Sequence, residues 1–186
     1  MAKPCGCGVQ KWQRLSQRTV WSCHYFEVSH ETYRLPRGGD GDYHYVKLAD
    51  SVFVVPVLDD GRLALVRQHR YLYQRASVEF PGGGIRGGAS ALEAAQAELR
   101  EEAGFAAESW EPIGRYAPCN GITTETCHLF VARGLTEVGA APEETEEMEL
   151  VLLAPDELRR AIAKGQVWDG MTVAAFGLYR AWLEER

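Results

Sequence analysis

The sequence predicts an α+β fold in which a mixed β-sheet is packed between helices. Three observations predict it. Short runs of apolar or alternating residues, each of strand length, recur through most of the 186-residue chain. A helix follows a glycine-rich loop near the middle, and a last helix at about 172–184 carries apolar residues at helical spacing. A chain of this length can bury one full hydrophobic core.

The first part of the chain is predicted to form an antiparallel β extension. Residues 20–28 and 31–35 favour strands, either two or one that bends, and residues 43–48 favour another. A glycine-rich turn separates the last strand from those before it. We therefore divide the sequence into a tail with a β extension at 1–48 and a main domain at 49–186.

An apolar run at 51–58 opens the main domain and predicts a buried strand. The Asp-Gly turn that follows predicts a hairpin, with residues 63–69 returning as the partner strand. A short strand at 77–80 leads into the glycine-rich loop. After the central helix we expect three further strands and a helix that begins at Pro155, a position where helices accept proline. The three strands are expected at 111–117, 126–132 and 148–153.

The central helix is marked by glycines at both ends. The loop at 81–88 precedes it, and Gly104 suits the left-handed position that follows a helix C-terminus. Glu98, Glu101 and Glu102 are three and four residues apart, so a helix places them on one face. A second face, which we expect to pack against the core, carries Leu92, Ala95, Leu99 and Ala103.

These clustered carboxylates indicate a metal site. Like charges at such spacings repel one another by roughly a few tenths of a kcal/mol per exposed pair. A hard divalent cation reverses the sign of that interaction, and oxygen ligands suit Mg²⁺ or Mn²⁺. The alternative is a solvated acidic helix face, and the glycines on either side of the helix favour the metal site.

Composition and charge exclude several classes of function. The net charge of −6 argues against a general nucleic-acid binder, which needs a basic stripe. No apolar run approaches the roughly 20 residues that span a bilayer, so we expect no membrane partner. The N-terminus lacks an apolar signal core, and the five cysteines lack the spacing of a disulfide framework. Both features predict a cytoplasmic protein with reduced thiols.

Seven residues of the loop and helix match a known pattern: Gly83, Glu98, Leu99, Glu101, Glu102, Gly104 and Phe105. The stretch resembles the Nudix box, but Ala89 stands in place of the box glutamate and Ala97 in place of the box arginine. In the family, that glutamate and arginine pair with each other and brace the loop against the helix. Replacing both partners of a buried pair is far less costly than removing one. The joint change therefore removes a brace and keeps the metal ligands.

The resemblance extends to the ADP-ribose pyrophosphatase branch of the Nudix hydrolases, which residues 66–71, 78–83 and 128–132 look like. It implies a Nudix pyrophosphatase that uses Mg²⁺ or Mn²⁺ to hydrolyse a nucleoside diphosphate sugar, foremost ADP-ribose to AMP and ribose 5-phosphate. One alternative is another such sugar, for example GDP-mannose. A second is a degenerate, non-catalytic nucleotide-sugar binding module. A third, a nucleoside triphosphate hydrolase, is disfavoured by the long segment before Ser51.

The resemblance also implies which residues hold the metal and perform catalysis. Glu98, Glu101 and Glu102 would bind the metal together with the backbone carbonyl of Gly82, and Glu101 and Glu102 are assigned to catalysis as well. Members of the branch often place a catalytic base in a later acidic loop. In this chain that loop lies at 139–147, and the predicted base is Glu146 or Glu144.

Four further residues are assigned to the substrate. Arg67 and Arg70 would bind phosphate, because a guanidinium matches the geometry of an oxyanion, and a surface charge is the alternative. Glu79 would bind metal or sugar, unless it is an outward strand residue. Asn120 stands where members that act on ADP-ribose often carry a proline, which favours other nucleotide sugars. The family further implies a homodimer, with N-terminal strands at 21–45 that complete the partner's substrate site.

Overall fold

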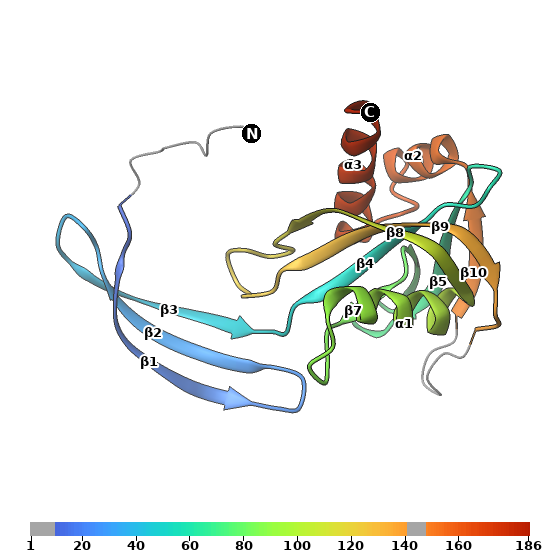
Figure 1. Ribbon diagram of the computed structural model, residues 1–186. Coiled ribbons are helices and arrows are strands. Elements are labelled where there is room, and N and C mark those ends of the chain that lie inside the picture. Colours follow the sequence, from blue (N-terminus) through green and yellow to red (C-terminus); the bar gives the residue numbers. More distant parts are fainter. Residues whose placement is uncertain (1–9, 141–147) are drawn as a thin grey trace. The chain divides into compact units, whose positions relative to one another are not determined.

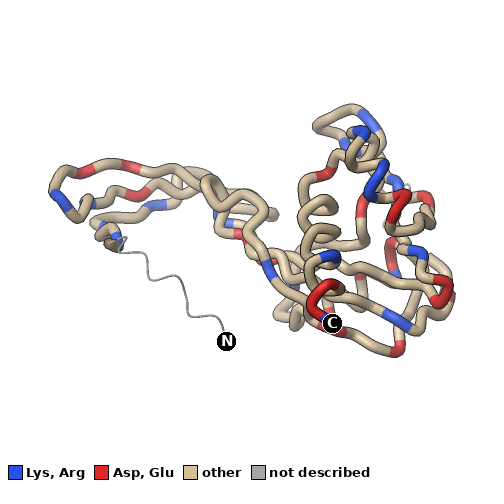
Figure 2. Tube along the Cα trace, turned by 90° about the horizontal axis from the view of Figure 1, so that it is seen from above, with Lys and Arg blue, Asp and Glu red and all other residues tan. Residues whose placement is uncertain are grey.

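The computed structural model describes residues 10–140 and 148–186, drawn in colour in Figure 1. This part of the chain divides into two compact units. One comprises the chain up to Leu48 together with Cys119–Thr124, and the other comprises Ala49–Pro118 and Glu125–Arg186. Basic and acidic residues are interspersed along both units (Figure 2). Within the described residues, no helix combines the length and apolar character needed to cross a membrane.

The N-terminal unit is built on a three-stranded antiparallel sheet in the order β1-β2-β3. Its strands are β1 (Gln13–Ser22), β2 (Glu27–Arg34) and β3 (Asp40–Lys47). The predicted antiparallel extension is therefore confirmed. The expected strand at 20–28 is wrong in its bounds, because the chain turns there and the Cys23 N–H donates to the Phe26 carbonyl at 3.0 Å.

The second unit contains two sheets. A four-stranded mixed sheet has the order β7-β4-β9-β8, and a three-stranded antiparallel sheet has the order β10-β5-β6. In the mixed sheet, β4 lies parallel to β9, and the other pairs are antiparallel. The strands are β4 (Ser51–Pro56), β5 (Leu63–Arg70), β6 (Arg75–Glu79), β7 (Gly82–Gly84), β8 (Phe105–Tyr116), β9 (Cys127–Glu137) and β10 (Met148–Leu153).

The predicted turn between 51–58 and 63–69 forms, but the long hairpin ladder does not. The Leu58 N–H donates to the Arg62 carbonyl at 2.9 Å, and one antiparallel bridge, between Val57 and Leu63, follows it. The reason is that β4 already pairs with β7 on one edge and with β9 on the other, so no edge is left for β5. After the turn the chain enters the second sheet, where β5 lies between β10 and β6.

Helices cover both faces of the mixed sheet, as the sequence predicts (Figure 1). Helix α1 (Ala91–Ala103) packs against β4, β7 and β8, and α3 (Gly170–Glu184) packs against β4 and β8. A shorter helix, α2 (Pro155–Ala163), begins at the expected proline. The periodicity of the C-terminal residues therefore identified a real helix, which begins two residues earlier than expected.

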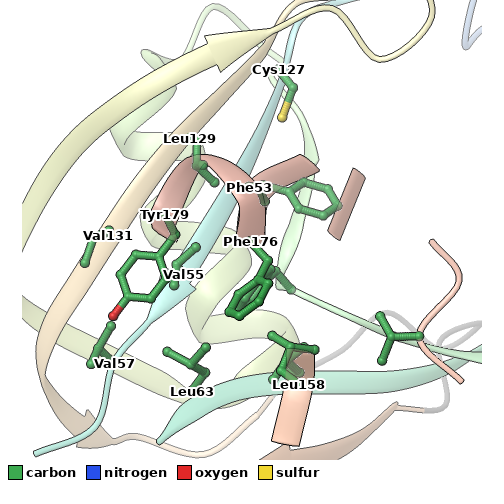
Figure 3. Packing of buried hydrophobic residues seen from close by; sticks show 14 residues of the cluster. Phe53, Val55, Val57, Leu63, Cys127, Leu129, Val131, Leu158, Phe176 and Tyr179 are labelled. Atoms are coloured by element: carbon green, nitrogen blue, oxygen red, sulfur yellow. The ribbon is translucent and has the colours of Figure 1, made fainter. Parts of the chain in front are cut away.

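Alternation along β4 divides the core between the two helical layers, because successive side chains of a strand point to opposite faces. Val52 and Val54 belong to the cluster that includes Leu99 of α1. Phe53 and Val55 belong to the other cluster, with Phe176 and Tyr179 of α3 (Figure 3). Strand β4 is buried along its whole length, as its apolar run predicts.

The expected packing face of α1 is correct at three positions and wrong at one. Ala95, Leu99 and Ala103 are buried, whereas Leu92 is 39% exposed. Ala94 and Glu102 are buried instead, so the buried stripe is rotated around the helix relative to the prediction. This rotation leaves Leu92, in the first turn, at the solvent edge and draws the Glu102 side chain into the protein.

Candidate active site

Local interactions set the position of the helix that carries the three carboxylates. Ser90 caps its N-terminus: the Glu93 N–H donates to Ser90 Oγ at 3.2 Å, and Glu93 Oε2 accepts from the Ser90 N–H at 2.8 Å. Such a reciprocal pair satisfies two helix-end donors, and a capping residue contributes about 1 kcal/mol. At the other end, Gly104 adopts φ 72°, the left-handed conformation that its sequence position predicts. These two ends fix where α1 begins and stops, and so which face of the helix each of its side chains lies on.

Close approach of β7 to α1 explains the glycines of the loop. The Gly82 N–H donates to Glu102 Oε2 at 2.8 Å, and Glu102 is only 8% exposed. A Cβ at Gly83 would collide with the Glu98 carboxylate, and one at Gly82 would collide with the Val52 carbonyl. A side chain at Gly82 would therefore displace the neighbouring strand, whereas one at Gly83 would displace only the Glu98 carboxylate.

A pocket of about 450 Å³ lies over this contact. Glu98, Glu101 and Glu102 line it with the fourth glutamate of α1, Glu93. The three glycines of β7 and Gln68 and Arg70 of β5 also line it. The prediction that one helix face presents Glu98, Glu101 and Glu102 together is therefore supported by their placement. Several carboxylates that meet at one pocket form an oxygen-rich donor set, which fits a hard divalent cation such as Mg²⁺ or Mn²⁺.

Arg70 is held at this pocket by a buried carboxylate. Its Nε lies 2.8 Å from Glu79 Oε1, and its Nη2 contacts Glu79 Oε2, so the two groups form a two-point fork. Glu79 is 2% exposed and Arg70 is 44% exposed. The hydrogen bond to Glu79 raises the pKa of the Arg70 guanidinium, and the charges of Asp169 and Glu102 raise it further. Glu79 is thus an inward residue whose carboxylate orients Arg70.

Arg67 lies elsewhere on the same strand. Alternation places it on the opposite side of β5 from Gln68 and Arg70, which line the pocket. Its Nη1 lies 2.7 Å from Glu149 Oε2, on the neighbouring strand β10, and both side chains are substantially exposed. The structure therefore shows Arg67 in a surface ion pair, and its predicted contact with phosphate stays a prediction.

Four predicted residues remain to be located. Asn120 is exposed and belongs to Cys119–Thr124, the segment that groups with the N-terminal unit. Glu144 and Glu146, the predicted bases, lie outside the described residues. Gly82 lines the pocket through β7, and its carbonyl as a metal ligand stays a prediction.

Sequence reasoning missed Arg86, an exposed residue of the loop that also lines the pocket. Its side chain makes no hydrogen bond or ion pair with any residue that the structure describes, and its backbone carbonyl accepts from the Ala89 N–H at 3.1 Å. Ala89 and Ala97, which replace the box glutamate and arginine, line the same pocket. Their short side chains leave open space in the pocket that the Arg86 guanidinium also lines. A cation within a glycine loop, next to an acidic helix, is the sequence signal that could have identified Arg86.

Comparison with known proteins identifies the family. A family model of the NUDIX domain matches residues 47–176. The chain belongs to the Nudix family. The family predicted from the box is therefore confirmed, and the enzyme is a Nudix hydrolase. The match extends from the last residue of β3 to α3 and includes every residue that lines the pocket.

Three curated proteins that this chain is similar to carry two different names. The chain is 28% identical over 158 residues to a methanol dehydrogenase activator from Bacillus methanolicus, covering 84% of this chain and 85% of that protein. It is 28% identical over 167 residues to an ADP-ribose pyrophosphatase from Mycobacterium tuberculosis, covering 88% and 80%. An ADP-ribose pyrophosphatase from Bacillus subtilis is 26% identical over 163 residues, covering 87% and 88%. These matches confirm the predicted resemblance to that branch.

The fold is also found in a solved structure. The crystal structure of an ADP compounds hydrolase superposes with a TM-score of 0.84 and covers 97% of this chain and 98% of that one, at 24% sequence identity. This likeness confirms the predicted Nudix fold.

Proposed function

We propose that this Nudix protein hydrolyses the pyrophosphate bond of a nucleoside diphosphate sugar, with ADP-ribose giving AMP and ribose 5-phosphate. The observation that carries the proposal is the meeting of Glu98, Glu101 and Glu102 with Arg70 at one pocket. Three carboxylates suit a divalent cation and the guanidinium suits a phosphate, which are the two partners that a pyrophosphatase must hold together. The two ADP-ribose pyrophosphatases among the relatives support this substrate class.

The residues divide into distinct roles in this proposal. Glu98, Glu101 and Glu102, with the carbonyl of Gly82, would hold Mg²⁺ or Mn²⁺. A cation bound there neutralises pyrophosphate oxygens and lowers the pKa of a bound water. Arg70 binds a substrate phosphate, and Glu79 holds the guanidinium in place for that contact. Arg67 and Asn120 stay proposed substrate contacts, and Glu144 or Glu146 stays the proposed base.

The N-terminal unit supports a homodimer, which we propose as the working form, with residues 1–48 as the dimerisation segment. Strand β1 is an edge strand that is exposed along its whole length. It carries Leu15, Val20 and Trp21 as large apolar side chains that are 41–54% exposed. An exposed edge strand that carries apolar side chains is a surface where a second chain can pair. Gel filtration with light scattering should give twice the 20.7 kDa chain mass, and a monomer would refute the proposal.

A second candidate function rests on Ala89 and Ala97. Their joint replacement of the box pair favours a nucleotide-sugar binding module without catalysis. Both functions are compatible with a cytoplasmic location, which stays a prediction.

One experiment separates the two functions. The purified chain is incubated with ADP-ribose and Mg²⁺, and AMP is measured by chromatography. The control is the double variant Glu101→Gln, Glu102→Gln, which keeps the size of both side chains and removes their charge. AMP that disappears in the control supports hydrolysis. If no member of a panel of nucleotide sugars is cleaved while calorimetry shows binding, the chain is a binding module.

A further inference from the structure

Two histidines and an aspartate meet on the N-terminal sheet, remote in sequence from the Nudix box. His30 on β2 and His44 on β3 are direct cross-strand partners in the antiparallel register. Asp42 lies two residues before His44, so strand alternation places it on the same face. All three residues belong to the N-terminal unit, and no part of the proposed hydrolysis uses them.

Each of the three side chains offers a possible ligand atom, and these atoms lie close together. The imidazole rings are stacked, with centroids 4.4 Å apart and an interplanar angle of 22°. Asp42 Oδ2 lies 3.7 Å from His30 Nε2 and 3.5 Å from His44 Nδ1. Nitrogen and carboxylate atoms of the three side chains lie within 4.8 Å of one another.

These distances suit an ion better than direct hydrogen bonds. A hydrogen bond between nitrogen and oxygen normally spans about 2.7–3.2 Å, so neither imidazole makes a good one to Asp42. Ligands about 2.0–2.1 Å from a tetrahedral Zn²⁺ are themselves separated by about 3.4 Å. The two nitrogen–oxygen distances, 3.5 and 3.7 Å, are close to this separation. Rotation of the exposed His44 side chain would bring its ring nitrogen closer to the other two ligand atoms.

We propose that His30, Asp42 and His44 form a binding site for a borderline transition-metal ion of the Zn²⁺ type, separate from the carboxylate site on α1. Imidazole nitrogens suit Zn²⁺, whereas Mg²⁺ prefers oxygen ligands, so the two sites differ in the metals they select. Three protein ligands leave a fourth position for water. Such an ion links β2 to β3 through side chains and stabilises the sheet by mass action.

A hydrogen bond from Arg18 to His30 competes with metal binding at this site. Its Nε lies 3.3 Å from His30 Nδ1, so Nδ1 is the acceptor and the ring proton is on Nε2. A metal at Nε2 requires that proton to move to Nδ1, which breaks the contact with Arg18. The guanidinium is also a positive charge beside the metal position. Removing Arg18 should therefore strengthen binding about threefold or more.

The test is a competition titration of the full chain with Zn²⁺ against a chromogenic chelator. Excess Mg²⁺ is present to occupy the carboxylate site on α1, and a phosphine reductant is present to keep the thiols reduced. We expect one Zn²⁺ per chain and at least a tenfold loss of affinity in His30→Ala and in His44→Ala. His44 is exposed, so its replacement does not threaten the fold. The matched control is His24→Ala, an exposed histidine of the turn that precedes β2.

Two outcomes would overturn the proposed site, and a third would overturn its ligation through His30 Nε2. One is wild-type affinity for Zn²⁺ in both the His30 and His44 variants. The other is a Co²⁺ derivative whose spectrum shows thiolate charge-transfer bands, because these would place the ion on cysteines. Weaker binding in Arg18→Ala would rule out ligation through His30 Nε2. None of these readouts depends on hydrolysis, so the site stands or fails independently of the proposed function.

Discussion

Glu79 and Arg70 form a two-point ion pair in which the carboxylate is buried and the guanidinium reaches the pocket. The pair joins the end of β6 to the end of β5, next to the glycine loop. A buried carboxylate is costly unless it is paired, so Glu79 keeps Arg70 in one orientation. This contact explains how Arg70, at the end of a strand, is held in a fixed position at the pocket.

We predict that Glu79→Gln lowers both stability and activity. The substitution leaves the Arg70 charge without its partner, which should cost about 1–3 kcal/mol of unfolding free energy. We also expect about tenfold lower kcat/KM for ADP-ribose, since Arg70 is no longer oriented. Urea unfolding and steady-state kinetics measure the two effects.

Glu149→Gln is the matched control for this prediction. It breaks the exposed pair with Arg67, which is a single contact of 2.7 Å between side chains that lie in solvent. Exposed pairs contribute about 0–1 kcal/mol, so we expect a change within that range and near-normal activity. Equal losses in both variants would mean that the Glu79 pair has no special role.

Gly83→Ala should weaken metal binding and leave the fold intact. The new Cβ would collide with the end of the flexible Glu98 side chain, which moves aside and carries its carboxylate away from the pocket. We expect about a tenfold loss of Mn²⁺ affinity by calorimetry, with an unchanged circular dichroism spectrum. Gly84→Ala is the control, because a Cβ there comes no closer than 3.9 Å, to Arg86 Nε. A loss of the same size in Gly84→Ala would contradict the steric explanation.

Arg86→Ala should raise KM for ADP-ribose several-fold with little change in kcat. The guanidinium lines the pocket without a partner among the described residues, and a charge-assisted contact with a phosphate would strengthen substrate binding. Steady-state kinetics at two salt concentrations would show the effect shrink as salt rises. Arg159→Ala on α2 is the control, since this arginine contacts Asp156 on its own helix. An unchanged KM would exclude Arg86 from the substrate site.

Ala89→Glu and Ala97→Arg together should restore the box pair. Both alanines line the pocket, so the pair would occupy space that is open in this chain. We expect the double variant to gain about 1 kcal/mol of stability, with a higher melting temperature and turnover. Each single variant should gain nothing, because the added charge has no partner. A double-mutant cycle without coupling would reject the role of these residues as a brace.

Cys127 should resist alkylation in the folded protein. It is fully buried at the start of β9, and burial raises the pKa of its thiol, which lowers the thiolate fraction at any given pH. Cys23 and Cys119 are exposed. Peptide mass spectrometry after iodoacetamide treatment should show rapid labelling of the exposed thiols and labelling of Cys127 only after unfolding. Early labelling of Cys127 would mean that β9 opens locally.

The candidate site was predictable from sequence where it depends on local structure. Helical periodicity and capping chemistry act within a few residues, so α1 and the shared face of Glu98, Glu101 and Glu102 could be predicted. Arg67 and Arg70 could not be told apart in this way. Both are arginines at the end of one strand, and only the sheet decides that Arg70 faces the pocket and Glu79 while Arg67 faces Glu149.

By itself, the sequence determined the α+β class, the positions of most strands, the C-terminal end of α1 and the Nudix family. Each of these follows from short-range patterns in which neighbouring residues supply the interaction. Tertiary structure alone decided that β4 pairs with β9 instead of β5, that Ala89 and Ala97 open space beside Arg86, and that His30 lies opposite His44. These relationships join residues far apart in the chain, and they depend on which strand edges remain unpaired once the core has formed.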